Sequence, residues 1–250
     1  MQLLLDMGNS RLKSAVLSRD KTLTQHVAVA YEPQEPIQTL VAHLDQYQTV
    51  KSIVIVSVLG GEFRQQLTAI CKQRNIELQW AISEAHAKGI VNQYHKPEQL
   101  GADRFVALVG ARNLFPDQSC IVIDCGTAVT IDALTDNGVF CGGVIVPGLA
   151  LWGERLIGRA DQLNDHQVVD TQLLAKNTAQ AIGSGSVFGL SCAIEGIYQR
   201  MSVELQKVSK QAVGPKAVIC GGDAALVTQY TQLDFELMPH LVLMGLAAYT

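Results

Sequence analysis

One pattern occurs twice in this sequence of 250 residues, and it constrains the fold more than any other feature. The first copy is an apolar run that ends in Asp6-x-Gly8 and is followed by a second apolar run, and the second copy does the same around Asp124-x-Gly126. An apolar run, a short polar turn and another apolar run predict a β-hairpin. The copies lie about half the chain length apart, so the sequence predicts two related lobes that each begin with such a hairpin.

The turn of each predicted hairpin carries groups that suit a charged ligand. A carboxylate at the strand end can hold a cation or the water around it. The glycine that follows lets the backbone turn sharply and brings its N–H groups close to an anion. One copy alone is better interpreted as an ordinary Asp-x-Gly turn. Two copies at this spacing, followed by Asn9 and Thr127, favour a ligand site.

Apolar strands and amphipathic helices alternate along the rest of the chain, which predicts an α/β fold. The break at Phe115-Pro116-Asp117-Gln118 is the best lobe boundary, so we predict an N-terminal lobe over 1–115 and a C-terminal lobe over 116–250. The expected strands are 52–58, 78–82 and 216–220, and the expected helices are 63–74, 99–114, 179–201, 224–230 and 241–249.

Composition excludes several classes of protein. Hydrophobic residues make up 48% of the chain and charged residues 17%, which is typical of a compact globular protein rather than a disordered one. The formal net charge of -4 provides no overall basic field for DNA or RNA, so no nucleic acid partner is expected. No apolar run reaches the roughly 18 residues of a membrane span, and the N-terminus lacks a signal peptide. We therefore expect a cytoplasmic protein that does not bind a membrane.

The six cysteines form no CxxC pair, so neither a disulfide framework nor a zinc site is expected. We expect buried, reduced thiols. Cys125 lies beside the second turn and is not expected to be catalytic.

Phosphoryl transfer needs groups that hold and neutralise the phosphates, and a carboxylate that takes the proton of the acceptor. The first turn offers a phosphate cradle, to which Lys13 can reach back from the next strand, although on spacing alone Lys13 is equally a strand-edge lysine. The chain has neither a Walker A loop nor a G-x-G-x-x-G fingerprint. The candidate cradle comprises Asp6, Met7, Gly8, Asn9, Ser10, Arg11, Leu12 and Lys13.

The candidate acceptor site is Gly101-Ala102-Asp103-Arg104, at the start of a predicted helix, where the helix dipole favours anions. Asp103 is the candidate general base, and Arg104 is the candidate clamp for a carboxylate. The alternative is a helix-start Asp beside a solvated Arg. Two further glycine clusters, 142–148 and 221–223, indicate either a close approach to a ligand or another chain, or tight turns.

Taken together, these motifs resemble the type III pantothenate kinases. The matching strings, in chain order, are Asp6-x-Gly8-Asn9-x-x-x-Lys13, Gly101-Ala102-Asp103-Arg104, Asp124-x-Gly126-Thr127-Ala128-x-Thr130 and Gly142-Gly143-x-Ile145-x-Pro147-Gly148. One departure is Ser10, where the family usually has Thr; the hydroxyl is retained. The resemblance implies an α/β fold of two duplicated actin-like (ribonuclease H-like) lobes with the nucleotide cleft between them.

The resemblance also implies a reaction and a set of roles. The enzyme would use ATP to phosphorylate pantothenate to 4′-phosphopantothenate, the first step of coenzyme A biosynthesis, and would be a homodimer whose partner chain completes the substrate pocket. The segment from Asp6 to Lys13 and Thr127 would bind ATP, with Asp6 placing Mg²⁺ through water. Asp124 would hold a monovalent cation, K⁺ or NH₄⁺. Asp103 would be the base, and Tyr94, Gly101 to Arg104 and Thr178 would contact pantothenate.

Other interpretations stay open on the residues alone. Tyr94 is equally an amphipathic cover on the core, and Thr178 a helix N-cap with Asn177 as its competitor. A non-catalytic regulator on the same nucleotide-binding fold, or a kinase of another small hydroxyl compound, is the alternative function. The presence of the candidate base and cradle residues favours the enzyme over the regulator.

Overall fold

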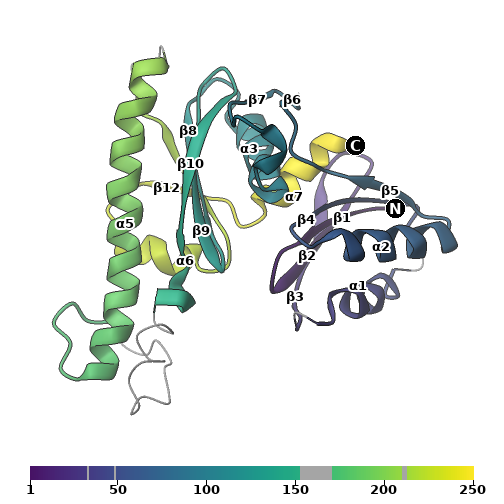
Figure 1. Cartoon of the computed structure of the whole chain (residues 1–250), viewed down its shortest axis with the longest axis horizontal. Coiled ribbons are helices and arrows are strands. Elements are labelled where there is room, and N and C mark those ends of the chain that lie inside the picture. Colours follow the sequence, from purple (N-terminus) through teal and green to yellow (C-terminus); the bar gives the residue numbers. More distant parts are fainter. Residues whose placement is uncertain (33, 48, 153–170, 210–212) are drawn as a thin grey trace. The chain divides into compact units, whose positions relative to one another are not determined.

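The computed structural model describes residues 1–32, 34–47, 49–152, 171–209 and 213–250 (Figure 1). The chain forms two compact units. The first comprises Met1–Leu114 and His240–Thr250, and the second comprises Phe115–Pro239. Each unit is built around its own mixed β-sheet.

The sheet of the first unit contains the first predicted hairpin. Its strands, in sheet order, are β3 (Leu23–Ala30), β2 (Arg11–Leu17), β1 (Gln2–Met7), β4 (Ser52–Ser57) and β5 (Glu77–Trp80). β1 and β2 pair antiparallel, with Asp6 opposite Lys13, and β2 and β3 also pair antiparallel. β4 runs parallel to β1 on its other side, and β5 runs parallel to β4. The end of β1 therefore lies between a hairpin turn and the carboxyl end of a parallel strand.

One face of this sheet is covered by α1 (Pro36–Leu44) and α2 (Gly61–Gln73). Successive side chains of a strand point to opposite faces, and Leu3, Leu5 and Met7 of β1 all point into the core that these two helices close. All three side chains are fully buried. Their burial fixes the register of β1, because a shift by one residue would turn them to the other face.

The other face of β1, to which Leu4 points, is contacted by α7 (Leu241–Leu246), and β4 is contacted by α3 (Ala102–Leu114). The helices α3 and α7 also pack against each other. A Cβ atom added to Gly245 would lie 2.0 Å from the carbonyl oxygen of Val106, so the two helix backbones touch directly.

This packing places the end of the chain in the first unit. The boundary predicted after residue 115 lies beside the observed one, between Leu114 and Phe115. The predicted lobe over 116–250, however, included His240–Thr250, which the structure groups with the first unit. The sequence pattern predicted a helix over 241–249 but could not identify α3 as its partner, because that contact exists only in the tertiary fold.

A short irregular segment connects β5 to α3 in the first unit. It contains the small hairpin of β6 (His86–Ala87) and β7 (Ile90–Asn92), followed by the 3-10 helix η1 (Pro97–Gln99). A last 3-10 turn, η3 (Ala247–Tyr249), follows α7.

The second unit repeats the strand arrangement of the first. Its strands are β12 (Phe235–Leu237), β11 (Lys216–Cys220), β8 (Cys120–Cys125), β9 (Ala128–Leu134) and β10 (Val139–Pro147), adjacent in this order. β8, β9 and β10 pair antiparallel in succession, as β1, β2 and β3 do. β11 runs parallel to β8 and β12 parallel to β11, as β4 and β5 do beside β1. The prediction of two duplicated α/β lobes is confirmed.

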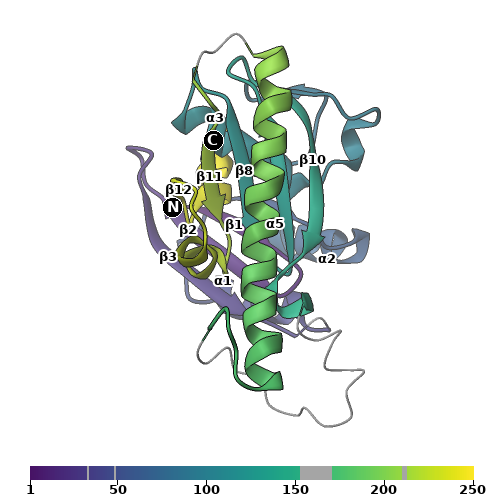
Figure 2. The same cartoon turned by 90° about the vertical axis from the view of Figure 1, so that its left-hand side faces the viewer.

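The long helix α5 (Thr178–Val208) covers the sheet of the second unit (Figure 2). Its residues Leu190, Ile194 and Leu205 are buried against β8, β9 and β11. Its N-cap is Asn177, whose side chain accepts a hydrogen bond from the Gln180 N–H at 2.9 Å. The turn Ala224–Val227 forms α6, and Thr228–Tyr230 forms the 3-10 helix η2.

Among the described residues, α5 is the one helix that by length and composition could cross a membrane. This corrects the expectation that no apolar run in the sequence reaches that length. The length criterion is met because small residues and sparse charges keep the helix weakly apolar over many turns. One third of the apolar stretch (33%) is buried inside the protein, and a core helix that packs on a sheet meets the same criterion.

The six cysteines are free. Cys71, Cys120, Cys125 and Cys220 are buried as expected, whereas Cys141 and Cys192 are exposed. The apolar residues around Cys141 and Cys192 in the sequence did not indicate that one face of β10 and one face of α5 are exposed.

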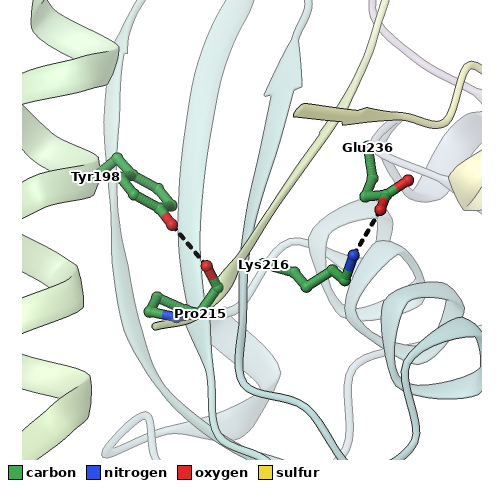
Figure 3. A network of polar contacts seen from close by, with 4 residues as sticks. All are labelled: Tyr198, Pro215, Lys216 and Glu236. Atoms are coloured by element: carbon green, nitrogen blue, oxygen red, sulfur yellow. Dashed lines mark hydrogen bonds and ion pairs between the residues drawn. The ribbon is translucent and has the colours of Figure 1, made fainter. Parts of the chain in front are cut away.

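Polar contacts tie the start of β11 to its neighbours in the second unit (Figure 3). The Tyr198 hydroxyl of α5 donates a hydrogen bond to the Pro215 carbonyl at 2.6 Å. The Lys216 ammonium pairs with the Glu236 carboxylate of β12 at 2.6 Å and lies 5.4 Å from the centre of the Phe115 ring. These contacts fix β11 between α5 and β12.

Replacement of Tyr198 by Phe tests this anchoring. The change removes one hydrogen bond and keeps the ring, so we expect the free energy of unfolding to fall by about 1 kcal/mol, measured by urea denaturation. Tyr230→Phe is the matched control, because the Tyr230 ring packs edge-on against Phe188 and its hydroxyl makes no hydrogen bond to any described residue. Equal stability of the two variants would contradict the role of Tyr198.

Candidate active site

The turn between β1 and β2 is closed by main-chain and side-chain hydrogen bonds. The Gly8 N–H donates to the Arg11 carbonyl at 3.1 Å, and the Tyr31 N–H donates to the Ser10 carbonyl at 3.1 Å. The Tyr31 hydroxyl donates to the Gly8 carbonyl. Burial, with a smaller contribution from the Asp6 carboxylate, raises the pKa of Tyr31, so this hydroxyl keeps its proton. Tyr31 was not predicted as a site residue, since no local motif links it to a turn more than twenty positions earlier.

Two charged residues of the predicted cradle, Asp6 and Lys13, lie near each other. The Lys13 ammonium lies 3.9 Å from the Asp6 carboxylate, and the two side chains are 27% and 10% exposed. Asn9, Ser10 and Arg11 are exposed at the turn. Met7 and Leu12 were also predicted to bind ATP, but their side chains are fully buried in the core, so they offer a ligand only main-chain atoms.

The second turn, between β8 and β9, is one residue tighter and is packed against β10. The Gly126 N–H donates to the Ala128 carbonyl at 3.2 Å, and Gly148, just after β10, donates to the Thr127 carbonyl at 3.1 Å. A Cβ on Gly148 would lie 2.2 Å from the Gly126 carbonyl oxygen. Gly148, the last residue of the glycine cluster at 142–148, therefore allows close contact with the turn that carries Thr127. Thr127 itself is exposed.

Asp124 meets the glycine turn that follows β11. Gly221 has a φ of +97°, and a Cβ there would lie 2.5 Å from Asp124 Oδ1 and 2.4 Å from the Cys125 carbonyl oxygen. The Asp223 N–H donates to that same carbonyl at 3.1 Å. Two of the sequence motifs therefore converge at the carboxyl ends of the parallel strands β8 and β11.

The thiol of Cys125 lies under this pair of turns. Burial raises its pKa to about 12, and the Asp124 and Asp223 carboxylates contribute in the same direction. A thiol that keeps its proton is a poor nucleophile, which agrees with the expectation that Cys125 is not catalytic.

The acceptor residues of the first unit lie together around a buried guanidinium. Arg104 is 8% exposed, and its Nη1 donates a hydrogen bond to the Tyr94 hydroxyl at 3.1 Å. Asp103, in the first turn of α3, accepts the Arg104 N–H at 2.8 Å. A Cβ on Gly101 would lie 2.6 Å from the same Asp103 oxygen, so the absence of a side chain at Gly101 leaves room for the carboxylate. The alternative of a solvated Arg is wrong.

Thr178 lies in the second unit as the first residue of α5, where it is exposed. The capping side chain is that of Asn177, so the alternative role of Thr178 as the N-cap is wrong. Ala102 is the first residue of α3.

The described residues contain no cluster of three or more His, Cys, Asp or Glu side chains that could hold a metal ion by themselves. A cation that is shared with phosphate oxygens and water needs fewer protein ligands. Asp6 and Asp124 each offer one carboxylate at a strand end, which fits such a shared cation.

A family model described as type III pantothenate kinase matches residues 2–200, a range that contains every predicted site residue. The chain belongs to the type III pantothenate kinase family. It is 34% identical over 254 residues to a type III pantothenate kinase of Herminiimonas arsenicoxydans, with 98% of this chain and 96% of that protein covered. A type III pantothenate kinase of Nitrosomonas eutropha is 33% identical over 245 residues, with 98% and 92% covered. The expectation from the four sequence motifs is confirmed, and this chain is a kinase.

Solved structures agree on the fold. A Campylobacter jejuni protein described as a Baf family transcriptional activator gives a TM-score of 0.60 at 20% identity, with 97% of this chain and 94% of that chain covered. A Sinorhizobium meliloti protein described as a 2-dehydro-3-deoxygalactonokinase gives 0.59 at 15% identity, with 99% and 97% covered. At these identities the likeness shows only the shared two-lobed, actin-like kinase fold, and neither name bears on the activity of this type III pantothenate kinase.

Gly221→Ala tests the contact between the two turns of the second unit. Alanine is strained at positive φ, and its Cβ would collide with the Asp124 carboxylate and the Cys125 backbone. We expect kcat/KM for ATP to fall about tenfold or more, measured by initial rates. Gly214→Ala, where a Cβ meets no atom within 4 Å, is the control. Equal kinetics in both variants would show that the turns are not coupled.

Proposed function

We propose that this chain transfers the γ-phosphoryl group of ATP to the hydroxyl group of pantothenate. The product is 4′-phosphopantothenate, and the reaction is the first step of coenzyme A biosynthesis. The carrying observation is the acceptor site, where Asp103 at the start of α3 lies beside the buried Arg104 and its hydrogen-bond partner Tyr94. A proton acceptor next to a fixed cation is what a hydroxyl substrate with a carboxylate requires.

The turn between β1 and β2 binds the ATP phosphates. Gly8, Asn9 and Ser10 form this turn, which is exposed at Asn9 and Ser10, and Arg11 and Lys13 supply positive charge. The Lys13 ammonium is held near Asp6, so it is directed toward the turn and not into solvent. Thr127, exposed at the equivalent turn of the second unit, contacts ATP through its hydroxyl.

Asp103 is the general base that accepts the proton of the attacking pantothenate hydroxyl. Arg104 binds the pantothenate carboxylate, and its bond to the Tyr94 hydroxyl keeps the guanidinium in one orientation. Gly101, Ala102 and Thr178 complete the contacts to pantothenate. Because phosphoryl transfer depends mainly on positioning and charge, a rigid Arg104 is of more use than a mobile one.

ATP is used with a divalent metal ion, and Asp6 places that ion, Mg²⁺, through water. Mg²⁺ usually keeps several of its waters in sites of this kind, which suits a lone carboxylate at a strand end. Asp124 holds a monovalent cation, K⁺ or NH₄⁺. The supporting feature is the close contact between the Asp124 carboxylate and the Gly221 turn, because a carboxylate held at a strand end is a ligand for such an ion.

The enzyme is a cytoplasmic homodimer in which the partner chain completes the pantothenate pocket. The supporting feature is α5, which buries only part of its apolar length in its own unit and exposes Val203 and Val208. Small residues along a helix let another helix approach closely, and Thr178 stands at the start of this one.

Asp103→Asn tests the base. An amide cannot accept the proton, so we expect kcat to fall about 100-fold or more, while the Kd for ATP changes less than about threefold. Coupled ADP release and isothermal titration with ATP measure the two quantities. Asp234→Asn, at an exposed position, is the control. Turnover within about tenfold of the parent enzyme would remove Asp103 from this role.

Replacement of K⁺ by Na⁺ in an assay of pantothenate-dependent ADP release tests the reaction and the cation together. We expect turnover with K⁺ or NH₄⁺ and about a tenth or less with Na⁺, because the cation contributes to charge stabilisation. Asp124→Asn should lose this preference. ADP release that does not depend on pantothenate would contradict the proposed acceptor, and full activity in Na⁺ would contradict the cation site alone.

A further inference from the structure

We infer that Asn92 is a positioning residue for the acceptor site, acting through the loop that carries Tyr94 and ends at Gly101. This inference rests on the proposed function, which assigns that loop to pantothenate. The loop follows β7 and precedes α3. Two main-chain hydrogen bonds, from Gln99 to Lys96 at 3.0 Å and from Leu100 to Pro97 at 3.2 Å, close a single turn near its end. They leave Tyr94 outside that turn.

Asn92 holds the loop with both ends of its side-chain amide. Its Oδ1 accepts the Tyr94 N–H at 3.0 Å. Its Nδ2 donates to the Ser83 hydroxyl at 3.2 Å and to the Pro97 carbonyl at 3.2 Å. The residue is 7% exposed, so water cannot readily replace these bonds. Two of these bonds join the start of the loop to Tyr94 and Pro97 further along the chain, and the third joins it to Ser83, which precedes the loop.

The Pro97 carbonyl is the common acceptor of this cluster. It receives the Ser83 hydroxyl at 2.8 Å, the Asn92 amide at 3.2 Å and the Leu100 N–H at 3.2 Å. A carbonyl oxygen has two lone pairs, so three donors use its full capacity. The cluster thus closes the loop between residues 92 and 97 and brings it against the segment that contains Ser83.

Tyr94 is consequently fixed at two points. Its N–H is bound by Asn92, and its hydroxyl accepts a bond from the buried Arg104. Asn92 contacts Tyr94, which is proposed to contact pantothenate, and Asn92 itself is not proposed to contact the substrate. Displacement of a positioning element by about 1 Å can cost up to about 100-fold in rate, so loss of the Asn92 bonds should act on pantothenate selectively and leave the ATP cradle unaffected.

Asn92→Asp distinguishes the role of the amide oxygen, which accepts a hydrogen bond, from that of the amide nitrogen, which donates two. The carboxylate keeps an acceptor for the Tyr94 N–H but turns an oxygen toward Pro97 O and Ser83 Oγ, where the native residue has a donor. Proton uptake restores one donor, and burial beside a carbonyl oxygen favours the protonated acid. The variant therefore has a pH signature that a general loss of packing would not produce.

The experiment compares the KM for pantothenate, the KM for ATP and kcat of Asn92→Asp and the parent enzyme at about pH 8 and about pH 6. We expect the KM for pantothenate to rise about tenfold at the higher pH and to return to within about threefold of the parent value at the lower pH. The KM for ATP should stay within about twofold at both values. Ser83→Ala, which removes one partner and no charge, should raise the KM for pantothenate by about twofold to fivefold with no dependence on pH.

Two controls make the result decisive. Asn75→Asp introduces the same charge at an exposed position of the first unit and should leave every constant unchanged. Arg104→Lys tests the acceptor site itself, because an ammonium cannot reproduce a two-pronged contact. If Arg104→Lys raises the KM for pantothenate and Asn92→Asp does not, or does so without dependence on pH, the role of Asn92 is overturned. If neither variant changes this KM, the proposed acceptor site is overturned instead.

Discussion

The carboxylate of Asp6 is the constraint around which the first unit is organised. It lies buried between apolar residues of β1, and a buried charge is costly unless it is paired or coordinates a cation. Lys13 lies across the hairpin from Asp6 and pairs with it. The turn that follows Asp6 is closed by its own main-chain hydrogen bond and by a hydrogen bond from Tyr31. The core beneath β1 thereby holds a carboxylate at a strand end, where under the proposed function it places the metal ion that accompanies the phosphates.

The acceptor site also holds a buried charge, here the positive charge of the Arg104 guanidinium. Arg104 is among the least exposed charged residues in the part of the chain that the structure describes, and it donates a hydrogen bond to the Tyr94 hydroxyl. Under the proposed function, the carboxylate of pantothenate binds this guanidinium. A guanidinium that is already held in one orientation loses less freedom on binding, which is how a preorganised site gains affinity for a ligand of the right charge.

The sequence predicted the parts of this arrangement that are local. Each hairpin, its Asp and its Gly lie within one short segment, so periodicity and turn chemistry were enough to find them. It did not predict Tyr31 or Asn92, because each acts on a residue whose proximity results from the fold and has no motif of its own. The same limit explains why α7 was placed with the second lobe: its contact with α3 through Gly245 joins segments that lie far apart in the sequence.

The duplicated sheets place a carboxylate at the same strand end in both units. Both units end a central strand in Asp and place a parallel strand beside it. In the first unit the turn is one residue longer, Tyr31 donates a hydrogen bond to its Gly8 carbonyl, and the nearby positive charges of Arg11 and Lys13 favour an anion. In the second, Gly221 lets the turn after β11 lie against the Asp124 carboxylate, and a carboxylate at a strand end favours a cation. The difference between the halves therefore lies in the residues around each turn, while the shared strand order keeps both carboxylates at equivalent strand ends.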